Sequence, residues 1–263
     1  MQLYYFPTPE AKLFAAYHEP PTASQDLAVL VCYPLCQEYL SAHRTCRQLA
    51  GMLSEAGFPT LRFDYFACGD SGGSTDQACL EGWLENISAA AEQIKAKSNA
   101  SRLCLVGLRF GATLATVAAL RNSSIDSLVL WDPIVKGTDY LAELAAFHEK
   151  VVDAVESYSR GVARPTVFDG LSLYGFRPQL KQELATIDLL ASNESPARRV
   201  LLLESTAGSG RAALAAHLQQ RVPSFQYQQI PAQEDLWTMD FELAIPPRQI
   251  LNAIVAWISE VSQ

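Results

Sequence analysis

The sequence has little positive charge for its size. Lysine and arginine number 20 against 28 aspartate and glutamate residues, which gives a formal net charge of −8 and a pI near 5.0. An acidic surface repels nucleic acid and anionic membranes, so we expect neither as a partner. The basic doublet Arg198-Arg199 leads into an apolar run and is too small to bind phosphate.

Long apolar runs are also missing. No window reaches the ~18 uninterrupted apolar residues that a membrane-spanning helix needs. The segment Met1–Glu10 has no cationic start followed by an apolar stretch, the pattern typical of a signal peptide. We therefore expect a cytoplasmic protein with no membrane-spanning helix and no signal peptide.

Charged residues make up only 18% of the chain, whereas apolar residues make up 49%. Disordered segments show the opposite balance, so we expect a folded protein with a substantial core. The length of 263 residues suits one large domain, or a domain with a cap. No internal repeat is visible.

Cysteine is present, but its spacing does not indicate a metal site. Two of the thiols, Cys32 and Cys104, fall within apolar runs, where cysteine packs as a small hydrophobic residue. The series Cys32, Cys36, His43, Cys46 resembles a metal cluster only superficially, because it matches no zinc spacing. We expect reduced, mostly buried thiols and neither a metal nor a cofactor.

Short apolar runs alternate with longer helical patterns along most of the chain. This alternation predicts an α/β fold, with a mostly parallel central sheet and helices on both faces. The expected strands are Leu3–Phe6, Leu13–Tyr17, Leu27–Tyr33, Thr60–Tyr65, Leu103–Val106, Ser127–Trp131, Val200–Glu204 and Phe225–Ile230. The expected helices include one that Ser41 caps and Gly57 ends, and one from Phe110 to Leu120.

The rhythm changes between residues 137 and 194. Two helical patterns, Leu141–Val155 and Leu180–Leu190, follow each other without a strand between them. We predict that 137–194 is a helical cap inserted into a core formed by residues 1–136 and 195–263.

Three segments together resemble the α/β-hydrolase superfamily. Residues 62–73 resemble its Asp-x-x-Gly-x-Gly-x-Ser turn, residues 106–112 its Gly-x-Ser-x-Gly nucleophile elbow, and residues 34–38 the loop that builds the oxyanion hole. The pairs Gln37-Glu38 and His43-Arg44, with 130–133, look like the serine-aminopeptidase-like branch, especially its exosortase-associated members. The resemblance implies the α/β-hydrolase fold and acyl chemistry.

The residues that would perform this chemistry are missing. Arg109 stands at the nucleophile position between Gly107 and Gly111, and a guanidinium that is always protonated cannot attack a carbonyl. The stretch 205–209, where the resemblance places the acid, contains no carboxylate. Asp235 or Glu234 stands where the base is expected. Loss of all three members indicates loss of the serine-hydrolase mechanism.

Arg109 has two interpretations. It could fill the former active site by pairing with Asp235, Glu234 or Asp132, which is the interpretation we favour. It could instead receive an anion, helped by the N-terminus of the helix from Phe110. Asp132 itself could be a displaced catalytic acid, or it could simply turn the chain after a strand.

Other residues offer weaker catalytic alternatives. Cys36 with His43 is a conceivable substitute nucleophile and base. Ser71 is expected to brace the glycine-rich turn, and His148 lies on an apolar helix face, where histidine usually packs.

We expect an aromatic-lined ligand pocket beneath the cap. Its predicted lining residues are Leu35, Cys36, Arg109, Phe110, Asp132, Asp235 and Trp237. Two functions remain open. One is a non-hydrolytic protein that binds a small anionic or acyl ligand, or a protein partner. The other is an enzyme of ester, amide or thioester chemistry that uses substitute residues or a repurposed pocket.

Overall fold

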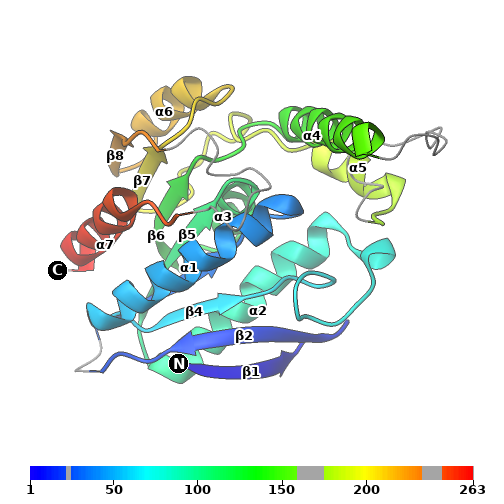
Figure 1. Cartoon of the computed structure of the whole chain (residues 1–263). Helices are drawn as coiled ribbons and strands as arrows, with labels where there is room; N and C mark the ends of the chain where they lie inside the picture. Colours follow the sequence, from blue (N-terminus) through cyan, green and yellow to red (C-terminus); the bar gives the residue numbers. More distant parts are fainter. Residues whose placement is uncertain (22–24, 159–174, 233–244, 263) are drawn as a thin grey trace.

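An eight-stranded, mostly parallel sheet forms the centre of the protein (Figure 1). The computed structural model describes residues 1–21, 25–158, 175–232 and 245–262. The strand order is β1-β2-β4-β3-β5-β6-β7-β8, in which β1–β2 and β2–β4 pair antiparallel and all other neighbours pair parallel. The predicted α/β architecture is confirmed.

Each expected strand is present, with small differences at the ends. The strands are β1 Gln2–Pro7, β2 Lys12–His18, β3 Leu27–Cys32, β4 Thr60–Phe63, β5 Arg102–Leu108, β6 Ile125–Trp131, β7 Arg199–Glu204 and β8 Ser224–Gln229. Every residue of β3 is buried, as are all but the first of β5. Parallel strands are covered on both faces, which explains why they appear in the sequence as unbroken apolar runs.

Helices cover both faces of this sheet. They are α1 Gln37–Glu55, α2 Leu80–Ser98, α3 Phe110–Arg121, α4 Gly137–Tyr158, α5 Pro178–Ala185, α6 Arg211–Gln219 and α7 Arg248–Ser262, with a short 3₁₀ helix η1 Thr75–Gln77. Helices α1 and α7 pack together in front of the sheet in Figure 1, whereas α2 and α3 pack together behind it. Within the described ranges, no helix is long and apolar enough to cross a membrane.

The first helix begins earlier than the sequence suggests. Helix α1 starts at Gln37, and its N-cap is Cys36, with a φ of 56°. The prediction that Ser41 caps this helix is therefore wrong, because the chain turns sharply just after β3 and Ser41 lies buried inside the helix. Its end is as expected, since Gly57 follows with a φ of 95°.

Two helices lie between β6 and β7. Helix α5 is shorter than predicted, because hydrogen-bonded turns follow Ala185 and return the chain to the start of α4. The Gly137 N–H donates to the Ile187 carbonyl over 2.9 Å, and the Leu189 N–H donates to Val135 over 2.9 Å. The division of the chain into a core and a cap stays a prediction.

Candidate functional site

Arg109 occupies a nucleophile elbow. It lies between the end of β5 and the start of α3, with φ 52° and ψ −123°. A Cβ on Gly107 would lie 2.3 Å from Ala112 Cα, and one on Gly111 would lie 2.2 Å from the Tyr33 carbonyl oxygen. Only glycine fits at both positions, so the elbow that the spacing predicted is confirmed.

Two carboxylates hold the Arg109 guanidinium. Its Nε donates to Glu38 Oε1 over 2.7 Å, and its Nη2 donates to Glu143 Oε2. Glu38 comes from the first turn of α1, and Glu143 comes from α4. The Arg109 side chain is 8% exposed, against 4% for Glu38 and 45% for Glu143. The elbow is therefore filled by an internal ion-paired cluster.

Burial and charge act against each other in this cluster. Burial lowers the pKa of Arg109, but Glu38 and Glu143 outweigh it, so the pKa lies above its ordinary value and the guanidinium stays charged. Burial raises the pKa of Glu38, and Arg109 opposes the rise. Glu38 Oε2 is buried and has no hydrogen-bond partner among the described residues.

Asp132 is not the partner of Arg109, which corrects that part of our prediction. Its carboxylate accepts from Arg211 Nη1 over 2.7 Å, from the Ser205 backbone N–H over 2.8 Å and from the Ser205 hydroxyl over 2.5 Å. Thr206 donates to it as well, over 3.1 Å. Asp132 and Arg211 are 0% and 1% exposed as side chains. These contacts favour the interpretation of Asp132 as a structural residue at the turn after β6 over that of a catalytic acid.

The structure does not describe the other two predicted partners of Arg109. Glu234 and Asp235 lie outside the described residues, as does Trp237. At the position where the resemblance places an acid, the chain has Ser205 and Thr206, whose hydroxyls donate to Asp132.

The described contacts of Cys36 and His43 give no support to the pair that we considered. Burial, together with the neighbouring Cys68, raises the pKa of the Cys36 thiol, which disfavours a thiolate. His43 lies two helical turns along α1, where its ring stacks on Tyr33 at 6.1 Å and contacts Tyr39 at 6.0 Å. The pairing of Cys36 with His43 therefore stays a hypothesis.

The glycine-rich turn after β4 is braced as expected. The Ser71 hydroxyl donates to the Asp64 carbonyl over 2.6 Å and accepts from the Phe14 N–H over 2.9 Å. The Asp64 carboxylate accepts from Tyr39 and from the Asp70 N–H, both over 2.9 Å. All four contacts are structural and leave Ser71 no catalytic partner among them.

The predicted pocket residues are mostly packed. Leu35 is 2% exposed, Phe110 is 0% exposed and Asp132 is 0% exposed. The ring of Tyr140, from α4, stacks on Phe110 with centroids 4.5 Å apart and planes 18° apart. Side chains of α4 thus fill space above the elbow. His148, further along α4, is buried, as expected for a packing residue.

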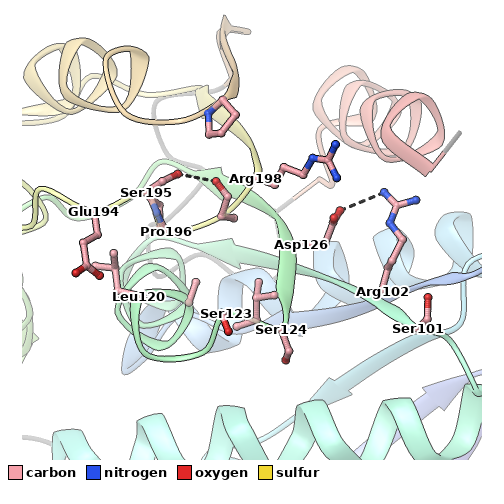
Figure 2. A pocket seen from close by; sticks show the side chains of 14 residues that line it. Ser101, Arg102, Leu120, Ser123, Ser124, Asp126, Glu194, Ser195, Pro196 and Arg198 are labelled. Atoms are coloured by element: carbon pink, nitrogen blue, oxygen red, sulfur yellow. Dashed lines mark hydrogen bonds and ion pairs between the residues drawn. The ribbon is translucent and has the colours of Figure 1, made fainter.

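A cavity lined by described residues lies at the N-terminal ends of β5 and β6, at the opposite end of β5 from the elbow (Figure 2). It has a volume of about 540 Å³, and Arg102, Asp126 and Arg198 are among its lining residues. Arg102 pairs with Asp126 at 3.1 Å and donates to the Val261 and Ser262 carbonyls at the end of α7. Arg102, held by Asp126, therefore anchors the end of α7.

Sequence reasoning missed three residues of the cluster around the elbow. Glu38 entered only as part of the family resemblance, and Glu143 and Tyr140 were not considered. The sequence does indicate that Tyr140 and Glu143 lie together, because they are three residues apart and so share a face of α4. Within the described ranges, no three His, Cys, Asp or Glu side chains gather in a way that could hold a metal ion.

Comparisons with known proteins support the fold at low sequence identity. No family model and no curated protein matches the sequence. The solved structure of the esterase Est1E from Butyrivibrio proteoclasticus with ferulic acid is similar at 17% identity and a TM-score of 0.65, over 98% of both chains. The proline iminopeptidase of Mycobacterium smegmatis is similar at 13% identity and a TM-score of 0.66, over 99% of both chains.

A third similar structure is XC6422 from Xanthomonas campestris, described as an α/β serine hydrolase without a lid. It has 18% identity and a TM-score of 0.61, and the match covers 98% of this chain and 94% of that one. These full-length matches agree with the strand order, the glycine-lined elbow after β5 and the braced turn after β4. The chain has the α/β-hydrolase fold.

Proposed function

We propose that this α/β-hydrolase-fold protein is non-hydrolytic and binds a ligand or a protein partner. The observation that carries the proposal is the pairing of Arg109, at the nucleophile position, with Glu38 and Glu143. A cytoplasmic location is part of the same proposal.

The chemistry of the elbow supports this. Acyl transfer needs a nucleophile that can lose a proton to a neighbouring base. The Arg109 guanidinium offers only N–H donors and no lone pair for attack. The buried carboxylate beside it, Glu38, is committed to the ion pair. The hydroxyls of Ser205 and Thr206, where the resemblance places the acid, already donate to Asp132.

An enzyme with substitute residues is the second candidate. It is favoured by the retained elbow, in which Arg109 keeps a backbone conformation that L-residues rarely adopt. Cys36, the N-cap of α1 beyond the neighbouring strand β3, has a similar conformation, with φ 56° and ψ −136°. Two similar solved structures carry the names of an esterase and a proline iminopeptidase, so an acyl substrate would be the first to test.

A fluorophosphonate probe and an activated ester separate the two candidates. We expect no covalent labelling of the full-length protein and no burst of product from p-nitrophenyl acetate, with an active serine hydrolase as the positive control. A steady rate of up to ~10³-fold over water would still fit the proposal, because backbone donors alone can supply it. A stable adduct on any residue would overturn the proposal, and one on Cys36 or Ser71 would identify a substitute nucleophile.

A further inference from the structure

The two carboxylates that bind Arg109 differ in how easily they could leave. Glu38 belongs to α1, is 4% exposed and faces Nε at 2.7 Å. Glu143 belongs to α4, is 45% exposed and binds Nη2. Removing a buried partner leaves an uncompensated charge, whereas a half-exposed ion pair is readily replaced by water or by another ion. Glu143 is therefore the exchangeable partner.

The charge of the cluster limits what could bind there. One guanidinium faces two carboxylates, so a further anion would add to an existing excess of negative charge. An anionic group can approach Arg109 without that cost only by taking the place of a carboxylate. A singly charged carboxylate replaces Glu143 with no change in charge or in hydrogen-bonding geometry, whereas a doubly charged phosphate does not.

A second donor lies beside Arg109. The Tyr140 hydroxyl is buried and has no hydrogen-bond partner of normal geometry among the described residues. The Tyr140 ring is fixed by its stacking on Phe110, the first residue of α3. The hydroxyl lies close to Cys36, Glu38 and Arg109, whose charges act on its pKa together with burial, the largest cause of its rise. The acceptor beside the hydroxyl is the Cys36 thiol, which is a weak one, so the phenol is available to a stronger acceptor.

The backbone adds to this preference for an anion. Arg109 is the N-cap of the 12-residue helix α3, and the N-terminus of a helix favours negative charge near it. The cluster thus combines a guanidinium edge, a phenol donor and a helix N-terminus close to Arg109.

From these contacts we infer that Glu143 is an internal stand-in for the carboxylate of a ligand. The ligand carboxylate displaces Glu143, accepts from Arg109 Nη2 and Tyr140 Oη, and leaves the Arg109–Glu38 pair intact. This inference rests on the proposed ligand-binding function and adds the chemical class of the ligand. It also means that binding releases one contact of α4 with the elbow.

Titration of the full-length protein with small carboxylates tests this. Hexanoate and benzoate are the probes, hexanamide and benzamide are their neutral controls, and isothermal calorimetry at fixed ionic strength measures each Kd. Glu143→Gln should bind both carboxylates roughly tenfold more tightly than the wild type, because the internal competitor no longer occupies most molecules. Glu149→Gln, which removes an exposed charge from the same helix, should leave the Kd unchanged.

A third variant tests the proposed second donor without disturbing the ion pairs. Tyr140→Phe removes a hydroxyl that makes no normal hydrogen bond, so the variant should fold as the wild type does. In the Glu143→Gln background it should weaken carboxylate binding about tenfold, as expected for the loss of a hydrogen bond to an ion. Binding of the amides should not change in any variant.

Three results would overturn the inference. They are equal affinity of Glu143→Gln and Glu149→Gln, amides that bind as tightly as their acids, and no carboxylate binding by Glu143→Gln. If any of these occurs while the fluorophosphonate probe still fails to label the protein, the inference fails and the non-hydrolytic function stands. Covalent labelling would instead overturn the proposed function itself.

Discussion

Arg109 Nε and Glu38 Oε1 lie 2.7 Å apart, although the two residues are separated by 71 positions in the sequence. The sheet brings them together, because β3 and β5 are parallel neighbours with Cys32 opposite Gly107. The chain leaves both strands at the same edge, so the start of α1 and the elbow face each other. Their pairing places a buried, ion-paired cation at the elbow.

The Arg109–Glu38 pair should behave as a coupled unit in stability measurements. Arg109→Ala and Glu38→Ala should each lower the free energy of unfolding by ~3–5 kcal/mol, because each leaves a buried charge without its partner. The double variant should lose clearly less than the sum of the two, as measured by urea unfolding. Glu143→Ala should cost no more than about 1 kcal/mol, since its side chain is half-exposed. Strict additivity in the double variant would contradict the pairing.

Asp132 should contribute to stability through Arg211. Asp132→Ala should cost ~3–5 kcal/mol, because it strands a guanidinium that is almost fully buried. Asp188→Ala is the matched control, since Asp188 forms a longer, exposed ion pair with Lys136 at 3.7 Å and should cost less than about 1 kcal/mol. Thermal unfolding of both variants measures the difference. An Asp132→Ala protein as stable as the control would mean that the buried pair is not formed.

Two glycine substitutions should have opposite effects. Gly111→Ala puts a Cβ at 2.2 Å from the Tyr33 carbonyl oxygen, which is backbone and cannot move aside, so the variant should be severely destabilised. Gly51→Ala lies inside α1 with no atom within 4 Å, so it should stabilise the protein by about 0.5–1 kcal/mol. Urea unfolding of the two proteins side by side measures both effects. A tolerated Gly111→Ala would show that α3 does not pack against the end of β3 as described.

Histidine 18 should make stability depend on pH. Burial, with the charges of Arg62, the N-terminal amine and Arg47, lowers the pKa of His18 from 6.5 to about 4. Between these two values the unfolded chain binds a proton that the folded protein does not, so the free energy of unfolding should fall as the pH drops from 6.5 toward 4. In the folded state His18 Nε2 accepts from Arg62 Nε over 3.2 Å.

The His18→Gln variant isolates this contribution. Glutamine can still accept from Arg62 but does not titrate, so the variant should lose less stability than the wild type over that pH range. Urea unfolding at several pH values between 4 and 7.5 provides the comparison. Parallel curves for the two proteins would show that His18 is not held neutral by the fold.

The sequence alone was sufficient for the architecture and for the position of the elbow. Unbroken apolar runs such as Leu27–Cys32 mark buried parallel strands because burial on both faces leaves no polar positions. Gly107 and Gly111 mark the elbow because they stand two positions on either side of Arg109, where a tight turn leaves no room for a Cβ. These are consequences of local composition and spacing, which a single sequence records directly.

Only the tertiary structure decided which charges meet. Asp132 directly follows β6, the strand next to β5, yet Arg211, 79 residues later, binds its carboxylate from the start of α6. Arg109 is bound instead by Glu38 and Glu143, which arrive from two helices far apart in the sequence. An ion pair depends on distance and burial, and neither follows from residue type or spacing. The sequence therefore determined that an arginine stands at the elbow, whereas the packing of α1 and α4 decided which carboxylates bind it.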